Sequence, residues 1–261
     1  MSSLPYSEHV QENHRFWNEM AEEWVAAGER NWAKEDPHWG IWGIPESELE
    51  MLPSELGGKD AIELGCGTGY VSGWMHRRGA RCTGIDLSEN QLATAKRLAA
   101  EHGAEIRLLR GNAESVPLPD ESFDFAISEY GAATWCDPEL WVAEAWRLLR
   151  MGGELHFLCC SPWIGVFTPE NGAEVADRLV RSYFGIGPLD WREVEVEPGG
   201  IEWQLTISDW FQLFRRLGFE VLDFLELPAP ATAEGTRYLI PAEWAKRFPA
   251  ELVWKLRKIS R

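Results

Sequence analysis

The stretch AIELGCGTGY, residues 61–70, places three glycines within five positions directly after a short apolar run. Glycine is favoured where the backbone turns with a positive φ, or where another group comes too close for a side chain. A strand that ends in such a turn and continues into a helix is typical of doubly wound α/β sheets, which bind ligands at that turn. Gly65, Gly67 and Gly69 therefore predict both a fold class and the position of a binding site.

Strand-like and helix-like segments alternate along residues 60–160. The β-like runs are DAIELG, RCTGIDLS, IRLLRGNA, FDFAISE and GGELHFLCC. The helices predicted between them lie near 70–78, 89–102 and 137–149, and the third run leads into a loop. This alternation indicates an α/β fold with a doubly wound, mostly parallel sheet.

The remaining segments are predicted to surround this core. Residues 8–56 are interpreted as two helices separated by an aromatic loop, and the segments after 207 as a helix at 208–217, a strand GFEVLDFLEL and a final amphipathic helix at 241–257. We divide the chain into an N-terminal helical cover (1–56), a cofactor-binding Rossmann-like core (57–160), an aromatic insertion on the substrate side (161–207) and a C-terminal completion of the core (208–261).

Charge and composition exclude several classes of partner. A formal net charge of −17 would repel nucleic-acid phosphates, and no block of Lys and Arg compensates for it, so we predict no nucleic-acid partner. No apolar run reaches the roughly 20 residues of a membrane helix, and the start of the chain lacks a leader pattern. We therefore expect a cytoplasmic protein without integral membrane association. Five cysteines without metal-type spacing favour free thiols and no metal site, and the oligomeric state is left open.

The third glycine of the turn discriminates between two nucleoside ligands. A dinucleotide fingerprint is G-x-G-x-x-G, whereas this chain has G-x-G-x-G followed by Tyr70. The carboxylate of Glu63 would repel a pyrophosphate but suits a ligand with a cationic amine and a sulfonium. Asp86, at the end of the second strand-like run, is placed to bind ribose hydroxyls. S-adenosylmethionine fits this pattern better than a dinucleotide does.

The motifs together resemble those of the class I S-adenosylmethionine-dependent methyltransferases. ELGCGTG resembles motif I, GIDLS the acidic motif that follows it, and GNAESVPLPDESFDFAIS motif II with the fourth strand. EAWRLLRMGGELHF is similar to the helix, turn and fifth strand that come next in this family. The amino-acid sequence of motif II is most similar to that of the small-molecule branch of the family, which includes the quinone-biosynthesis C-methyltransferases. The resemblance implies S-adenosyl-L-methionine as cofactor and S-adenosyl-L-homocysteine as product.

The family also implies roles for individual positions. Glu63, Gly65 and Gly67 would surround the methionine part of the cofactor. Asp86 would hold both ribose hydroxyls, and Leu87 would flank the adenine. The family's acidic contact to adenine is Asn112 here, whose amide oxygen can still accept from the adenine amino group. The other predicted cofactor contacts are Cys66, Gly69, Gln91, Ala113, Glu114, Glu129 and Trp17.

The acceptor is expected beyond the end of the fourth strand, SEYGAATWCDP, which faces the methyl group in this fold. Tyr130 and Trp135 are predicted substrate contacts. No catalytic residue is assigned, because methyl transfer needs mainly a well-positioned nucleophile in a dry site. Glu129 is the one candidate for a general base, and it could equally anchor the cofactor's amino group.

Aromatic residues are concentrated in the segment 8–42, which is predicted to close over the site and to bring an aromatic face near the sulfonium. The aromatic insertion favours an apolar or aromatic small-molecule substrate. The sequence leaves open the acceptor and which of its atoms is methylated. Two alternatives also stay open: a non-catalytic S-adenosylmethionine sensor, and a nucleotide-dependent oxidoreductase, which Tyr70 disfavours.

Overall fold

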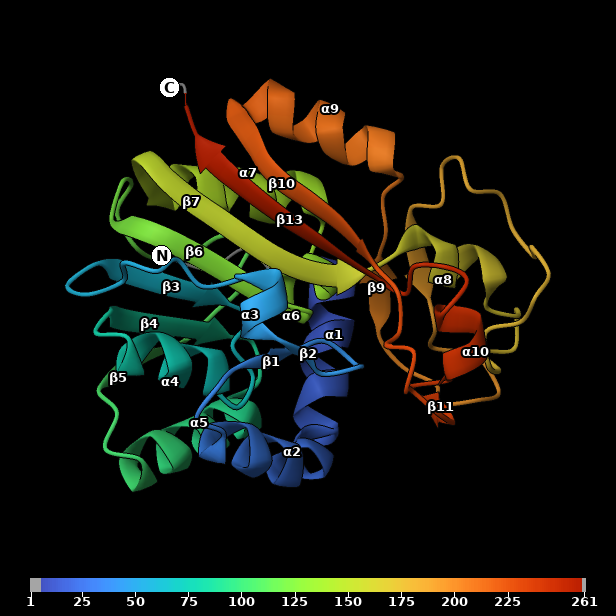
Figure 1. Ribbon diagram of the computed structural model, residues 1–261, viewed down its shortest axis with the longest axis horizontal. Coiled ribbons are helices and arrows are strands. Elements are labelled where there is room, and N and C mark those ends of the chain that lie inside the picture. The colour runs from blue at the N-terminus through green and yellow to red at the C-terminus, as the bar shows by residue number, and fades with distance from the viewer. Residues whose placement is uncertain (1–5, 260–261) are drawn as a thin grey trace.

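The computed structural model describes residues 6–259 and contains one seven-stranded sheet, in the order β10-β13-β7-β6-β3-β4-β5 (Figure 1). Five strands are mutually parallel, which confirms the doubly wound α/β prediction. They are β3 (Asp60–Leu64), β4 (Arg81–Asp86), β5 (Ile106–Arg110), β6 (Phe123–Glu129) and β7 (Leu149–Cys160).

The prediction of a final helix over 241–257 was wrong. The segment forms only a short helix, α10 (Ala242–Ala245), followed by strand β13 (Glu251–Lys258). Pro249 lies between them, and a proline inside a helix removes a hydrogen bond and clashes with the preceding turn. β13 pairs antiparallel with β7 on one side and with β10 (Phe219–Leu227) on the other. Because it is buried on both faces, its apolar residues do not alternate as those of a half-exposed strand would.

Helices cover both faces of the sheet. One face packs on α7 (Pro138–Leu148) and α9 (Ile207–Leu217) around a core that includes Ile62, Trp141 and Trp210. The other face of the sheet packs on α4 (Tyr70–Arg77), and Trp74 of this helix belongs to the apolar core on that side. Helix α5 (Glu89–Glu101) lies on the same side. A short helix, α6 (Gly131–Trp135), follows β6 at the carboxyl edge of the sheet.

The N-terminal segment is arranged differently from the prediction. Its two helices, α1 (Glu8–Glu19) and α2 (Ala21–Ala33), follow one another directly, and the aromatic loop comes after both. That loop forms a small hairpin of β1 (His38–Trp39) and β2 (Ile44–Pro45) before a one-turn helix, α3 (Glu46–Leu49). Trp32 and Trp39 are fully buried, so α2 and the hairpin each add a large side chain to the protein interior, whereas the buried residues of α1 are Val10 and Asn13.

A lobe stands at the carboxyl ends of the parallel strands, the side toward which the arrowhead of β7 points (Figure 1). We define the lobe as residues 161–206 and 228–250, which share one apolar cluster that includes Phe167 and Trp244. Within residues 6–259, no helix is long and apolar enough to cross a bilayer. The elements of the lobe are α8 (Pro162–Phe167), β8 (Pro188–Asp190), β9 (Ile201–Trp203), β11 (Thr236–Arg237), β12 (Ile240–Pro241) and α10.

Candidate functional site

The three glycines of the turn after β3 have different surroundings, although all have a positive φ. A Cβ on Gly65 would lie 2.5 Å from the backbone nitrogen of Ala132, and one on Gly69 would lie 3.1 Å from the Cβ of Ala95. A Cβ on Gly67 would meet only Oε1 of Gln91, at 3.9 Å. Gly65 and Gly69 are therefore needed for packing against the protein itself, and Gly67 is the position that stays open to a ligand.

Helix α2 packs directly on this turn. The indole nitrogen of Trp32 donates to the carbonyl oxygen of Thr68 at 2.9 Å. A Cβ on Gly28 would lie 2.7 Å from the Thr68 hydroxyl oxygen, and one on Gly73 would lie 2.5 Å from the Trp32 ring. The sequence analysis placed Trp32 in the segment 8–42 that is predicted to close over the site, but its contacts hold the backbone of the glycine turn rather than a ligand.

Asp86 lies beside the open glycine, as expected. Its Oδ2 accepts from the Gly67 N–H at 2.7 Å, and its Oδ1 accepts from the Ser88 N–H at 2.8 Å. Burial raises the pKa of Asp86, although these bonds oppose the rise. Leu87 is half-buried next to it. Each carboxylate oxygen has two lone pairs, so both retain acceptor capacity for hydroxyl groups.

The side chain of Gln91 indicates that a polar ligand binds next to Gly67. The residue is 4% exposed, and within the described part of the chain its Oε1 has no hydrogen-bond partner. An unpaired buried carbonyl costs about 1–3 kcal/mol. Because the same atom faces Gly67, a donor group bound at the open glycine would satisfy it.

Glu63 and Cys66 both lie in the interior at this turn. Oε2 of Glu63 accepts from the backbone N–H of Ser72 at 2.8 Å and from the Ser72 hydroxyl at 2.5 Å. Burial raises the pKa of Glu63 to about 8, and the neighbouring Glu129 and Asp86 add to the rise. The Cys66 thiol packs against Gly84 of β4, where a Cβ would come within 2.9 Å of its sulfur.

The three residues predicted beside the adenine follow β5 in a tight local turn. Oδ1 of Asn112 accepts from the Glu114 N–H at 3.0 Å, while Ala113 is buried. Oε1 of Glu114 lies 2.7 Å from Nε2 of His9 and accepts from the Asp137 N–H at 2.8 Å. Burial raises the pKa of Glu114, but these two bonds, the charge of His9 and a bond from Asn112 together outweigh it, so the pKa is lowered overall.

Glu129, the candidate base at the end of β6, is occupied by two donors. Oε2 accepts from the Tyr70 hydroxyl at 2.6 Å, and Oε1 accepts from the Gly40 N–H at 2.9 Å. Burial raises the pKa of Glu129, and these bonds and the charge of Lys34 oppose that rise. Tyr70, which stands where a dinucleotide site has glycine, thus orients a carboxylate of the site.

Comparison with known proteins agrees with this geometry. Residues 62–157 match a family described as "Methyltransferase domain". The chain is 38% identical over 101 residues to a malonyl-[acyl-carrier protein] O-methyltransferase of Serratia marcescens, a match that covers 38% of each chain. It is 34% identical over 112 residues to a demethylmenaquinone methyltransferase of Thermus thermophilus, covering 42% of this chain and 49% of the relative.

A solved structure extends the likeness beyond the motifs. An S-adenosylmethionine-dependent methyltransferase from Mesorhizobium loti superposes with a TM-score of 0.65 at 28% identity, over 81% of this chain and 95% of its own. Residues 62–157 are a class I methyltransferase domain. The predicted family, its fold and S-adenosylmethionine as its methyl donor are confirmed at this level. The chain spans less than half the length of the two curated relatives, so the activity of the whole protein is a proposal.

An aromatic cluster lies at the mouth of the methyltransferase site. The Trp17 ring of α1 is 5.1 Å from that of Trp135 in α6 and 5.7 Å from that of Trp24 in α2. Tyr238, in the hairpin of the lobe, stacks on Trp24 at 5.9 Å. The indole nitrogen of Trp17 is buried and has no hydrogen-bond partner among the described residues, while the residue as a whole is half-buried. The sequence analysis missed Tyr238, which no motif surrounds.

Helix α1 crosses the turns from which the methyltransferase site is built. Oδ1 of Asn18 accepts from the Ser88 hydroxyl at 2.9 Å, just after Asp86. His9 reaches Glu114 at the turn after β5, and the side chain of Asn13 donates to the Trp135 carbonyl at 2.8 Å. One short helix thereby contacts the segments that follow β4, β5 and β6.

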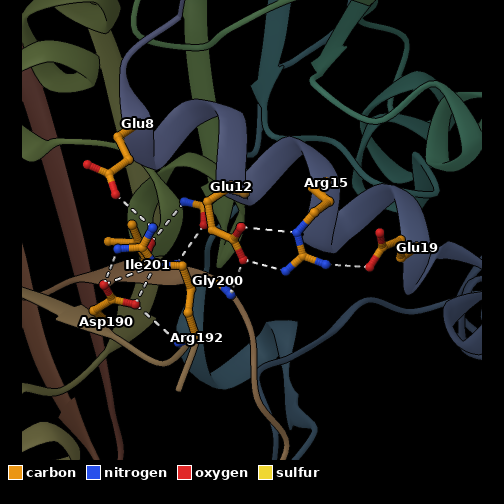
Figure 2. A network of polar contacts seen from close by, with 9 residues as sticks. Glu8, Glu12, Arg15, Glu19, Asp190, Arg192, Gly200 and Ile201 are labelled. Carbon is orange, nitrogen blue, oxygen red and sulfur yellow. Dashed lines mark hydrogen bonds and ion pairs between the residues drawn. The ribbon is translucent and has the colours of Figure 1, made fainter. Parts of the chain in front are cut away.

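The other side of α1 is joined to the lobe (Figure 2). Asn13 is buried and exchanges two hydrogen bonds with the backbone of Ile201, accepting at 2.7 Å and donating at 2.9 Å. Arg192 forms an ion pair with Glu8 at 2.7 Å, and the Gly200 N–H donates to Glu12 at 3.2 Å. We call these contacts the latch. They hold α1 between the methyltransferase site and the lobe.

Proposed function

We propose that this protein transfers a methyl group from S-adenosylmethionine to a small molecule, and that the donor binds beside Gly67. The observation that carries the proposal is the open glycine beside Asp86, with the unpartnered Gln91 oxygen facing it. The residues fit the cofactor: Asp86 offers acceptors for ribose hydroxyls, and the buried carboxyls of Glu63 and Glu129 would ionise beside a bound cationic amine and sulfonium, because a nearby opposite charge lowers the pKa of a carboxyl. The donor, when bound, supplies an electrophilic methyl group.

The chain's own residues would contribute orientation and exclusion of water. Asn112, Ala113 and Leu87 stand where the adenine would lie. Helix α1 would close the mouth and bring the Trp17 ring near the sulfonium, where a cation–π contact contributes about 0.5–2 kcal/mol. An in-line displacement gains most from holding its two reactants in position, so this arrangement needs no covalent intermediate on the protein.

Isothermal titration calorimetry with the full chain tests the donor site. We expect S-adenosylmethionine and S-adenosylhomocysteine to bind and NAD and ATP not to bind. Binding of NAD with no binding of S-adenosylhomocysteine would instead favour a nucleotide-dependent oxidoreductase. Incubation with labelled methyl donor and a metabolite extract then separates an enzyme from a sensor, because only an enzyme moves the label into a small molecule.

Several sequence predictions stay part of this proposal. They are the division into cover, core, insertion and C-terminal completion, the cytoplasmic location, and a small-molecule partner without nucleic acid. Tyr130 and Trp135 are kept as acceptor contacts. Their support is position: Trp135 belongs to the aromatic cluster, and Tyr130 directly follows Glu129 at the carboxyl edge of the sheet.

A further inference from the structure

A second group of acidic side chains lies beyond Glu129, toward the lobe. Glu251 is the first residue of β13 and is 0% exposed. Its Oε1 accepts from the Ile41 N–H at 2.9 Å and from the Tyr130 hydroxyl. Within the described residues, its Oε2 has no hydrogen-bond partner. A buried carboxylate oxygen without a hydrogen-bond partner lowers stability, so a donor group on a bound ligand would be favoured at this atom.

The neighbours of Glu251 extend this group into a row. Glu251 pairs across the sheet with Cys160, so both side chains lie on the same face about 5 Å apart. The Cys160 thiol lies close enough to Glu202 of β9 to lower the pKa of that carboxyl. Tyr130, Cys160 and Glu202 are half-buried and retain contact with solvent. We call Tyr130, Cys160, Glu202 and Glu251 the Glu251 row.

The charges acting on this row are mostly negative. Burial and, to a smaller extent, the nearby charge of Glu129 raise the pKa of Glu251 to about 7, against the hydrogen bonds from Tyr130 and Ile41. Burial also raises the pKa of Glu202, against bonds from Gln204 and Trp191 and the charge of Arg181. An anionic acceptor would be repelled here. A cation would relieve the repulsion and could satisfy Oε2 of Glu251.

We infer that the Glu251 row binds the methyl acceptor through a protonatable nitrogen, so that the substrate class is an amine with an apolar or aromatic body. This inference rests on the proposed function. The aromatic cluster of Trp17, Trp135 and Trp24 lies next to the row, because the Trp135 ring packs against Gly200, two residues before Glu202, and it suits the body of such a molecule. Aromatic faces also attract cations, so these side chains and the carboxylates favour the same ligand.

The row also accounts for the proton in the reaction. An acceptor that arrives as an ammonium ion gives one proton to the Glu251 carboxylate and regains its nitrogen lone pair. That pair forms the new N–C bond while the C–S bond breaks and its electrons remain on sulfur. The products are a methylated ammonium ion and neutral S-adenosylhomocysteine, and the proton on Glu251 passes to solvent.

Three molecules with one shared ring system test the inference. Tryptamine, tryptophol and indole-3-acetate carry an amine, a hydroxyl and a carboxylate on an indole, and each is titrated into the full chain saturated with S-adenosylhomocysteine. We expect tryptamine to bind about tenfold more tightly than tryptophol, and indole-3-acetate to bind most weakly. The inference would be overturned if the three molecules bound with equal affinity or if indole-3-acetate bound most tightly. It would also be overturned if tryptamine showed no binding up to millimolar concentration.

Matched variants locate the effect. Glu251→Gln keeps the shape and an acceptor oxygen but loses the charge, and should weaken tryptamine about tenfold while changing tryptophol little. Glu202→Gln is a second probe should the first variant fold poorly, as judged by thermal melting. Glu243→Gln, whose side chain is 84% exposed in the same lobe, is the control. Variants that leave the preference for the amine unchanged would contradict the assignment.

The cofactor titration keeps the two proposals separate. If S-adenosylhomocysteine does not bind the wild-type protein, the proposed function fails. If it binds but the amine shows no advantage, only the inference about the acceptor fails.

Discussion

The donor side and the acceptor side of the site are built in different ways. On the donor side, Gly67 and Asp86 are hydrogen-bonded across only 19 positions of the chain, at the ends of two neighbouring strands. On the acceptor side, Ile41 and Glu251 are hydrogen-bonded across 210 positions. The donor side is therefore assembled by local strand-to-helix turns, whereas the acceptor side depends on where distant segments meet.

This difference explains how the two sides can vary separately. The turns after β3, β4 and β5 build the donor site through the shared sheet. The lobe is attached at the carboxyl edge, and the hydrogen bonds described above for Gly67, Asp86 and Asn112 involve none of its residues. A common donor and a changeable acceptor are consistent with this arrangement.

The largest expected effect separates packing from binding within the glycine turn itself. Gly65→Ala would force a Cβ against the backbone of Gly131 and Ala132 at a φ of 75°, and should lower the free energy of unfolding by about 2–5 kcal/mol. Gly67→Ala has space and should lose only about 1–2 kcal/mol from its φ. Urea denaturation measures both, and equal losses would mean that the two glycines do not differ in role.

A second test asks whether the donor side acts through Asp86. Asp86→Ala removes the acceptors for two hydroxyls and should weaken S-adenosylhomocysteine roughly 10- to 150-fold, the range for one charged hydrogen bond. Glu89→Gln is the control, because Glu89 is close in sequence but exposed. Calorimetry that finds the same affinity for Asp86→Ala as for wild type would remove Asp86 from the site.

The sequence predicted where the residues of the proposed donor side lie in the fold, for a physical reason. Glycine turns, the acidic residue after the second strand and strand–helix alternation are local patterns, so Gly67, Asp86 and the parallel sheet could all be placed without knowing any distant contact. The sequence positions alone did not reveal that a side chain at Gly65 would collide with Ala132 or that one at Gly69 would crowd Ala95, because these neighbours come from other elements.

The acceptor side was predicted poorly for the complementary reason. Glu251 lay inside a predicted helix, because the apolar spacing of residues 241–257 fits a helix as well as a strand buried on both faces. Pro249 was the signal that could have separated the two. Tyr238 and Glu202 belong to no motif, and nothing in the sequence indicates that the lobe brings them to Trp24 and Cys160.

The latch joins the two sides and gives a smaller effect. Asn13→Ala would leave the backbone groups of Ile201 and the Trp135 carbonyl without their partner, at a cost of about 1–3 kcal/mol. Arg192→Ala removes exposed ion pairs with Glu8 and Asp190, which contribute little because solvent and salt screen them. We expect hydrogen exchange in α1 to rise clearly in the first variant and little in the second. Equal exchange in the two variants would show that the buried amide does not hold the helix.

The last test concerns pH and Glu63, whose buried carboxyl has a pKa raised from 4.5 to about 8. The folded protein then holds a proton that the unfolded chain releases above pH 4.5, so folding binds protons and the free energy of unfolding should fall as pH rises from about 4.5 to about 8. Below that window the group has no effect, and above it the loss is complete. Glu63→Gln keeps an acceptor for Ser72 but cannot ionise. The free energy of unfolding of the variant, relative to that of the wild type, should therefore increase as pH rises across this window. Urea denaturation at pH 5, 7 and 9 measures the difference. A constant difference between the two proteins would mean that Glu63 is already ionised when folded, as a carboxylate kept charged for a cationic donor would be.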